Sequence, residues 1–462
     1  MAKLNKYMFR EYDIRGRESR EELNTTTVSL IAKSYGTFLR KRNVSDAVLG
    51  HDNRETSEEF YEATKEGLLS TGVNVIVLGT ILTPMMYWAQ FHFKTHGGII
   101  VSASHNPPGW NGFKLAYGHS YTLIGDEVQE IYRVADSEEF TTGNGSFREE
   151  NIKNSYVNDL LKRAKLNKKL KVVVNTGNAT SSLVSPELFK KFGCDVIEHN
   201  TTLDPTYPNY PPNPARVDMM EDTAKVTVAN KADVGLAIDA DGDRLGVVNE
   251  KGDIIWPDRW LILLSRLVLK KNPGAKIIFD VKVSQALPED IEKHGGVPIM
   301  WKTGHSYIKQ KLHEEKAALA GEMSGHVFFV EDFYGFDDAN FAALKLLEYI
   351  SSQKEPLSRL IDGTPYYVST PTLHAPCPDE VKYEVVERVA KEFKEEGYEI
   401  IDINGARVLF NDGWGLVRAS GNLPVLVIRF EAKTEKRLKE IEETFRKKLG
   451  KFKEVSMDWE SG

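Results

Sequence analysis

The chain of 462 residues has very little cysteine, with only Cys194 and Cys377. Two thiols are too few for a disulfide framework or a four-ligand zinc cluster. No stretch approaches the roughly 20 consecutive apolar residues that cross a bilayer. The N-terminal residues MAKLNKYMFREYDIRG lack the apolar core of a secretory signal. We therefore expect a protein of the reducing cytoplasm with no membrane partner.

The sequence also lacks an excess of positive charge. Its formal net charge is −7, and Lys and Arg are spread along the chain rather than concentrated. A nucleic-acid-binding protein needs a concentrated basic face, so we expect no nucleic-acid partner. A small anionic ligand is not excluded, because local Arg and His groups bind phosphate whatever the overall charge.

What the sequence does contain is a repeated alternation of short apolar runs and amphipathic helical patterns, which indicates an α/β architecture. Thr56 and Glu59 have the spacing of a capping box at the start of a helix over 58–70. A single helix is expected near 181–193, a Pro-rich irregular loop over 201–216, and a linker over 363–380. The expected domains are 1–152, 153–250, 251–366 and a smaller α+β domain over 367–462.

The segment SASHNPPGWNGFK, residues 102–114, follows the apolar run GGIIV. Its prolines and glycines fix the path of the chain, so Ser104 is expected on a rigid loop. A serine hydroxyl becomes a good nucleophile only when a neighbouring group removes or polarises its proton, and His105 and Lys114 are candidates for this. An ordinary Pro/Gly turn with incidental polar residues explains the same letters.

The segment DADGDR places Asp239, Asp241 and Asp243 at alternate positions on a Gly-containing loop. Three carboxylates that converge in this way suit one hard cation such as magnesium. A calcium EF-hand is excluded, because Arg244 takes the position of the required glycine and the flanking residues are typical of strands. The alternative is a solvated acidic turn, although clustered carboxylates repel one another without a cation.

Two more loops carry polar groups near predicted strands. In GEMSGHVFF, Glu322, Ser324 and His326 alternate, so in an extended conformation they would point the same way and could contact sugar hydroxyls. A half-buried strand with a polar outer side is the competing interpretation. In RASGNLP, Arg418 and the backbone around Gly421 could cradle a phosphate.

Taken in this order, the motifs FREYDIRG, SASHNPPGWNGFK, DADGDR, KTGHS and GEMSGHVFF resemble the α-D-phosphohexomutase superfamily, and the resemblance covers the whole chain. The GEMSGH loop is most similar to the phosphomannomutase/phosphoglucomutase branch. The resemblance implies three similar α/β domains with mixed sheets, a smaller C-terminal α+β domain and an active site in a central cleft. It also implies interconversion of hexose 1-phosphates and hexose 6-phosphates of mannose or glucose.

The resemblance implies a role for each matching residue. Ser104 would carry the phosphoryl group, and a phosphoserine oxygen would complete a magnesium site made by Asp239, Asp241 and Asp243. Glu322 and Ser324 would bind two sugar hydroxyls. The other implied residues are the catalytic candidates Arg15, His105, Lys114 and His305, the substrate-binding candidates Tyr12, Arg244, Lys282 and His326, and the phosphate-loop candidates Arg418, Ser420, Gly421 and Asn422.

The implied cofactors are Mg²⁺ and a sugar bisphosphate activator, either glucose 1,6-bisphosphate or mannose 1,6-bisphosphate. One departure from the family pattern is Leu423, which replaces a threonine that is common in the phosphate loop. The alternative functions are a phosphoglucosamine mutase, a serine-dependent sugar phosphatase and a non-catalytic sugar-phosphate-binding protein. The last of these is expected to lack the serine or the acidic triplet, and both are present.

Overall fold

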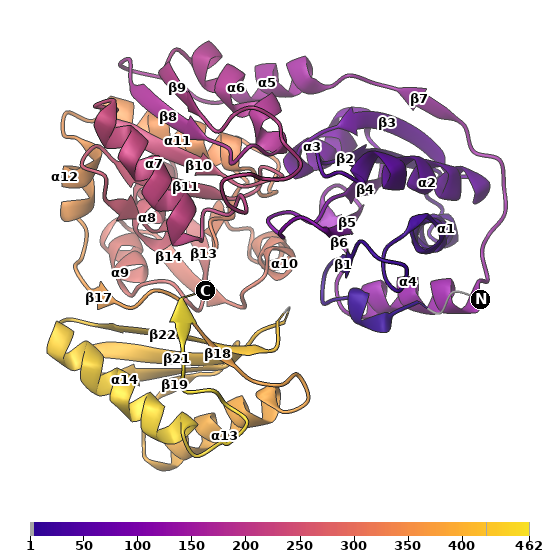
Figure 1. The fold of residues 1–462 in the computed structure, drawn as a ribbon. Helices are drawn as coiled ribbons and strands as arrows, with labels where there is room; N and C mark the ends of the chain where they lie inside the picture. The colour runs from indigo at the N-terminus through magenta and orange to yellow at the C-terminus, as the bar shows by residue number, and fades with distance from the viewer. Residues whose placement is uncertain (1–3, 422, 462) are drawn as a thin grey trace. The chain divides into compact units, whose positions relative to one another are not determined.

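The computed structural model describes residues 4–421 and 423–461. The chain forms two compact units, one of the described residues up to Ile255 with Ser324–Ser358, the other of Trp256–Met323 with Arg359 onward. Figure 1 labels most of the helices and strands of both units. Among the described residues, no helix has the length and apolar character required to cross a membrane.

The first unit begins with a seven-stranded mixed sheet of order β1-β5-β4-β2-β3-β7, with β6 paired to β5. The central strands β4, β2 and β3 are parallel, and β5 runs antiparallel to β4. Because β2 and β4 are parallel, the loops that follow them leave from one edge of the sheet. The elements are η1 (Lys6–Met8), β1 (Ile14–Arg17), α1 (Thr25–Lys41), β2 (Asp46–His51), α2 (Ser57–Ser70), β3 (Asn74–Thr80), α3 (Thr83–Phe93), β4 (Gly97–Val101), β5 (Trp110–Tyr117), β6 (Tyr121–Thr122), α4 (Asp126–Ser137) and β7 (Phe147–Glu149).

Local sequence explains how the helices of this region begin and pack. Asn24 and Thr27 form a reciprocal capping box at the start of α1. Gly36 lies where α1 passes closest to Thr71, since an added Cβ would meet the Thr71 hydroxyl at 2.2 Å. The expected capping box at Thr56 is wrong. The Thr56 side chain does not cap α2 but donates to the Glu18 carboxylate at 2.8 Å, a tertiary contact that its spacing to Glu59 did not reveal.

A second mixed sheet of the first unit has the order β12-β11-β10-β8-β9, in which β10, β8 and β9 are parallel. The helix expected near 181–193 is broken, because a 3-10 turn precedes α6. The Pro-rich segment 201–216 contains no helix or strand, as predicted. The elements are α5 (Lys153–Lys162), β8 (Lys171–Asn175), η2 (Thr180–Leu183), α6 (Ser185–Phe192), β9 (Asp195–His199), α7 (Val217–Ala229), β10 (Val234–Ile238), β11 (Leu245–Asn249), β12 (Ile254–Ile255), β16 (Val327–Phe329) and α11 (Ala339–Ser352).

The second unit contains strand β13 paired in parallel with β14 and β15, and a C-terminal antiparallel sheet of order β19-β20-β21-β22-β18-β23, with β17 on β22. Helices α13 and α14 share a hydrophobic core with this sheet (Figure 1). Helix α12 (Leu357–Asp362) carries the chain back into the unit. Its other elements are α8 (Pro257–Lys271), β13 (Lys276–Asp280), α9 (Ala286–Lys293), β14 (Val297–Trp301), α10 (His305–Glu315), β15 (Leu319–Gly321), β17 (Val368–Ser369), β18 (Leu373–Pro376), α13 (Lys382–Glu395), β19 (Ile400–Ile401), β20 (Ala406–Phe410), β21 (Gly413–Ala419), β22 (Val425–Ala432), α14 (Glu435–Leu449) and β23 (Glu460–Ser461).

The linker expected over 363–380 is only partly irregular. Strand β18 lies within it and pairs with β22 from Leu373 to Pro376. The four prolines of this segment and the short length of the apolar pattern hide this strand in the sequence, because proline is unusual inside a sheet. Pro376 is the last residue of the strand, where the missing N–H is tolerated.

Candidate active site

The loop between β4 and β5 presents Ser104 in a constrained conformation. Ser104 is 1% exposed and has φ +49°, a left-handed conformation that costs a serine free energy. Its N–H donates to the Ser102 hydroxyl at 2.9 Å. A non-glycine residue stays in this conformation only when its surroundings hold it there, so the position of Ser104 Oγ is fixed by the loop.

Two groups lie close to the Ser104 hydroxyl. His105 Nδ1 is 3.1 Å from Ser104 Oγ, and Ser104 Oγ donates to Asp239 Oδ2 at 3.4 Å. The serine and the aspartate are 135 positions apart in the chain, so the structure brings together the two loops that the sequence singled out separately. Burial lowers the pKa of His105 well below its ordinary value, and the nearby charges of Arg244 and Arg15 lower it further. The imidazole is therefore neutral at pH 7 and can exchange a proton with the hydroxyl.

The acidic loop between β10 and β11 is a tight turn around Asp239. Asp239 Oδ1 accepts from the backbone N–H groups of Gly242, Asp243 and Arg244 at 3.0–3.1 Å. Gly242 has φ +80°, which glycine adopts without strain. These three amides occupy one carboxylate oxygen, and the other oxygen faces Ser104.

The three aspartates fit a divalent cation. Asp239, Asp241 and Asp243 are all at most 1% exposed, and each offers a carboxylate oxygen within 4.8 Å of the others. Among the described residues, Asp241 Oδ1 and Asp243 Oδ1 accept no hydrogen bond although they are buried. Burial and the charges of the other two carboxylates raise the pKa of Asp239 well above its usual range. Buried, mutually repelling oxygen ligands of this kind are suited to a hard cation.

Lys114 on β5 is the positive group nearest to these carboxylates. Its Nζ lies 2.6 Å from Asp241 Oδ2 and 2.5 Å from Asp243 Oδ2. Burial disfavours the charged ammonium, but the two aspartates outweigh burial and raise the pKa of Lys114. Lys114 is therefore charged, and it neutralises part of the negative charge of the acidic loop.

Thr83, which the sequence did not single out, also binds the acidic loop. Its N–H donates to the Asp241 carbonyl at 2.9 Å, and its hydroxyl donates to Asp241 Oδ2 at 2.6 Å. Thr83 is the first residue of α3, so its N–H has no acceptor within the helix. The pattern Thr-Pro at a helix start was the available signal, but such pairs occur in many helices without a ligand.

Arg15 on β1 contacts the serine loop, residues 102–109 between β4 and β5, from another side. Its Nε donates to Asp13 at 2.8 Å, and its Nη1 donates to the Ala103 carbonyl and to Asn106 Oδ1. The guanidinium therefore holds the loop on both sides of Ser104. Tyr12 is half-buried and precedes Asp13 in the chain, so it shares this end of the strand.

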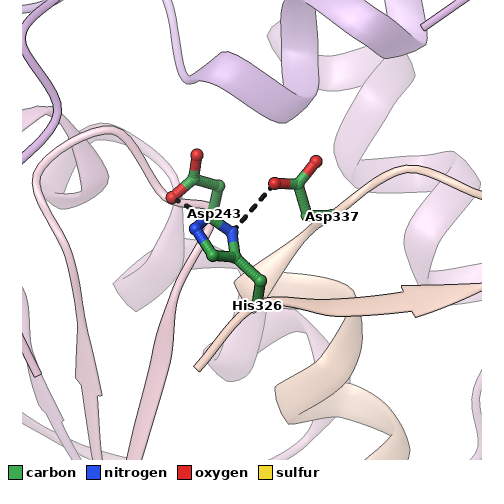
Figure 2. Close-up of side chains that lie close together, drawn as sticks. All are labelled: Asp243, His326 and Asp337. Carbon is green, nitrogen blue, oxygen red and sulfur yellow. Dashed lines mark ion pairs between the residues drawn. The ribbon is translucent and has the colours of Figure 1, made fainter. Parts of the chain in front are cut away.

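His326 lies in a buried cluster with two carboxylates, shown in Figure 2. Its Nδ1 is 2.9 Å from Asp337 Oδ2 and 3.7 Å from Asp243 Oδ1. Arg244 Nε donates to His326 Nε2 at 3.0 Å. Because a guanidinium only donates, Nε2 must accept, and the proton of the neutral ring is then on Nδ1, which faces the two carboxylates (Figure 2). Asp243 belongs both to this buried cluster and to the group of three aspartates, so the two clusters are adjacent.

The expectation that Glu322, Ser324 and His326 alternate along one extended strand is wrong. Met323 and Ser324 form a turn, Gly325 has φ +95°, and β16 begins only at Val327. A glycine between two polar residues permits the turn, and the alternation of polar letters does not distinguish a turn from a strand.

Three candidates of the second unit gather near the end of β13. Lys282 Nζ lies 3.3 Å from Asp280 Oδ2, and Glu322 Oε1 accepts from the Gly304 N–H at 2.5 Å. His305 follows Gly304 at the start of α10 and is 5% exposed. Asp280, which the sequence did not single out, also accepts from the Thr303 hydroxyl at 3.1 Å and so connects these groups.

The predicted phosphate loop begins with Arg418 on β21. The Ser420 hydroxyl accepts from the Leu423 N–H at 3.2 Å. Lys382 Nζ donates to the carbonyls of Ser420 and Leu423, a role the sequence did not indicate because Lys382 lies on α13, far along the chain. Asn422 lies outside the described residues.

Four family models match the chain, described as phosphoglucomutase/phosphomannomutase domains I, II and III, each alpha/beta/alpha, and the C-terminal domain. They match residues 6–142, 154–252, 256–367 and 373–448 respectively. The chain is 38% identical to a phosphomannomutase/phosphoglucomutase of Pseudomonas syringae pv. tomato over 96% of this chain and 95% of that one. It is also 38% identical to a phosphoglucomutase of Neisseria gonorrhoeae, over 96% and 97% of the two chains.

Solved structures are similar in fold. A crystal structure of a phosphoglucomutase/phosphomannomutase family protein from Burkholderia thailandensis has 37% sequence identity and a TM-score of 0.91. The match covers 97% of this chain and 98% of that one. Three α/β domains followed by a C-terminal domain, as expected from the sequence, are therefore confirmed.

Proposed function

The chain belongs to the phosphoglucomutase/phosphomannomutase family, and from this premise we propose that it interconverts hexose 1-phosphates and hexose 6-phosphates, with mannose and glucose as the sugars. Ser104 carries the phosphoryl group between the two hydroxyls of one sugar. The observation that carries this proposal is the buried, left-handed Ser104, whose Oγ lies 3.4 Å from Asp239 Oδ2.

In the proposed reaction, phosphorylated Ser104 donates its phosphoryl group to a free sugar hydroxyl. The bond between phosphorus and Ser104 Oγ breaks, a bond from phosphorus to the sugar oxygen forms, and the hydroxyl proton leaves the sugar. The proton released by the sugar hydroxyl replaces the phosphoryl group on Ser104 Oγ, so the transfer consumes no net proton, and His105 Nδ1, 3.1 Å from Oγ, is placed to relay it. The sugar then holds two phosphates, turns around, and returns the other phosphate to Ser104.

Asp239, Asp241 and Asp243 would hold Mg²⁺ in this enzyme. When bound, Mg²⁺ supplies positive charge that stabilises a phosphoryl group in transfer. Lys114 and Arg15 add fixed positive charge on the protein side of the same loops. Burial of Ser104 and the aspartates excludes water, which would otherwise hydrolyse the phosphoserine.

We propose, as the family resemblance implies, that the remaining residues bind the substrate. Glu322 and Ser324 bind sugar hydroxyls, and Tyr12, Arg244, Lys282, His305 and His326 surround the substrate. Arg418, Ser420, Gly421 and Asn422 hold the phosphate that does not react. Glucose 1,6-bisphosphate or mannose 1,6-bisphosphate serves as activator, because it re-phosphorylates a Ser104 that has lost its phosphate. The two cysteines are buried and free, as suits an enzyme of the reducing cytoplasm.

The Ser104→Ala variant tests this function directly. It should retain its fold and lose nearly all interconversion of glucose 1-phosphate and glucose 6-phosphate. Release of inorganic phosphate, measured in the same samples, separates a mutase from a serine-dependent phosphatase. Substantial turnover by the variant would contradict the proposal.

A further inference from the structure

Arg54, in the loop after β2, binds the backbone of the serine loop through an unusually complete set of hydrogen bonds. Its Nη2 donates to the carbonyls of Ser104 and Asn106 at 2.6 and 2.5 Å. Its Nη1 donates to the carbonyls of Pro107 and Trp110 at 3.0 and 3.1 Å. Three carbonyls of the loop 102–109 and the carbonyl of the first residue of β5 therefore converge on a single guanidinium.

The fifth donor of Arg54 is also used. Nε donates to Asp52 Oδ2 at 3.1 Å, and Asp52 Oδ1 accepts from the Arg54 N–H and from the Ser57 hydroxyl. A guanidinium has five N–H donors in a rigid plane, and in Arg54 each of the five has an acceptor. The side chains of Arg54 and Asp52 are 2% and 0% exposed, and solvent does not compete for these bonds.

Contacts from the second sheet of the same unit cover Arg54 and connect it to the acidic loop. The guanidinium carbon lies 5.3 Å from the ring centre of Tyr207, which belongs to the Pro-rich segment 201–216. The neighbouring residue Asn53 exchanges hydrogen bonds with Thr180 at 2.9 and 2.8 Å. Ser181, next to Thr180, donates to the Asp239 carbonyl at 2.5 Å.

We propose that Arg54 is the positioning residue for phosphoryl transfer, holding Ser104 in its left-handed conformation and setting the position of Oγ relative to Asp239. The proposal rests on the proposed function, in which Ser104 carries the phosphoryl group. Arg54 does not contact the Ser104 hydroxyl. Arg54 acts through the carbonyl of Ser104, and this hydrogen bond offsets the conformational strain at Ser104.

The Arg54→Lys variant tests this role, because lysine keeps the charge but offers at most three donors that cannot span four carbonyls and Asp52. Displacement of a reacting group by about 1 Å costs about 100-fold in rate. We expect kcat to fall about 100-fold while KM for glucose 1-phosphate changes by less than about twofold. Phosphorylation of Ser104 by glucose 1,6-bisphosphate, followed by intact mass in a single turnover, should slow by a similar factor.

A second variant keeps the test decisive if Arg54→Lys folds poorly. In Asp52→Asn, Oδ1 still accepts from the Arg54 N–H and from Ser57, but the amide nitrogen cannot accept from Nε. We expect a smaller fall in kcat, about tenfold, again without a change in KM. Arg42→Lys is the matched control, since Arg42 pairs with Glu130 on α4 and touches neither loop, and it should leave kcat unchanged.

The result that would overturn the proposal is a normal kcat per folded molecule in both Arg54→Lys and Asp52→Asn, with only the melting temperature lowered. Ser104→Ala, assayed in parallel, separates the two levels of the account. If Ser104→Ala is inactive and the loop variants are fully active, only the role of Arg54 is wrong. If Ser104→Ala retains turnover, the proposed function fails and the role of Arg54 fails with it.

Discussion

The ammonium of Lys114 lies 2.6 Å from the Asp241 carboxylate, and both side chains are buried. The pair compensates charge that the acidic loop would otherwise hold without a partner. Removing one member of a buried ion pair costs about 3–5 kcal/mol, because the other charge stays buried alone. The stability of the acidic loop should therefore depend on whether a cation is bound to it.

The Lys114→Met variant should be less stable than the wild type without metal but should bind Mg²⁺ more tightly. Without metal, its melting temperature should fall well below that of the wild type. With Mg²⁺, much of that loss should be recovered and Mg²⁺ should bind more tightly, because a competing positive charge has gone. Turnover should fall by about 10²–10³, the cost of losing one hydrogen-bond donor that stabilises charge developing in a transition state.

Thermal unfolding in EDTA and in Mg²⁺ measures the loss of stability and its recovery on metal binding. Equal Mg²⁺ stabilisation of variant and wild type would contradict this role, and Lys190→Met, in an exposed pair, is the control.

Asp241→Ala should abolish metal-dependent turnover. The carboxylate that it removes also accepts from Lys114 and from the Thr83 hydroxyl, so two hydrogen bonds are lost together with the proposed metal ligand. We expect kcat/KM at least about 100-fold lower and no measurable Mg²⁺ binding by calorimetry. Asp195→Ala, at an exposed position in the same unit, is the control. Wild-type activity that survives in EDTA would show that no divalent cation is needed.

Lys382→Met should weaken phosphate binding more than it slows chemistry. Lys382 Nζ donates to the Ser420 and Leu423 carbonyls and also pairs with Asp379 at 2.6 Å, so its loss frees the phosphate loop. A loss of about 1.4 kcal/mol corresponds to a tenfold rise in KM. Steady-state kinetics should show this rise with kcat changed less than about threefold. Lys391→Met, exposed on the same helix, should change neither constant. A fall in kcat at constant KM would exclude a binding role.

Asp338 should make the stability of the protein depend on pH. Burial raises its pKa from 3.8 to about 7, and its Oδ2 accepts from the Tyr156 hydroxyl at 2.7 Å. Between these pKa values the unfolded chain releases the proton and the folded chain keeps it. Stability therefore falls as pH rises from about 4 to 7, by on the order of 4 kcal/mol in total, and is constant above pH 7.

The Asp338→Asn variant removes this titration while it keeps an oxygen for the N-cap of α11. Urea unfolding at pH 5 and pH 8 should show the variant gaining about 3 kcal/mol on the wild type between the two values. Asp362→Asn, at an exposed site, should show no such gain. A difference between Asp338→Asn and wild type that is the same at both pH values would contradict the raised pKa.

The sequence predicted the parts of the site that depend on local composition. Ser104 on a Pro/Gly loop and the aspartates on a Gly turn are visible as letters, because the backbone conformation they need restricts the residue types nearby. The order of the loops along the chain then indicated the family and hence the fold. The resemblance, and neither loop alone, predicted that Ser104 and Asp239 lie close together.

The residues that the sequence did not reveal act across long separations. Arg54, Thr83 and Lys382 hold backbone or carboxylate groups that lie at least 38 positions away in the chain. An arginine, threonine or lysine that donates to a distant carbonyl looks like a surface residue in the sequence. The error at Thr56 has the same origin, since a tertiary contact with Glu18 overrode a local pattern. The error before Gly325 has a local origin, because alternating polar letters do not distinguish a turn from a strand.

The most direct test of the account is the intact mass of the wild type and of Ser104→Ala after incubation with glucose 1,6-bisphosphate. We predict one added phosphoryl group on the wild type, located at Ser104, and its transfer to sugar when glucose 1-phosphate is added. Ser104→Ala should gain no mass. A phosphoryl group on another residue, or interconversion of the sugar phosphates without any phosphorylated protein, would contradict it.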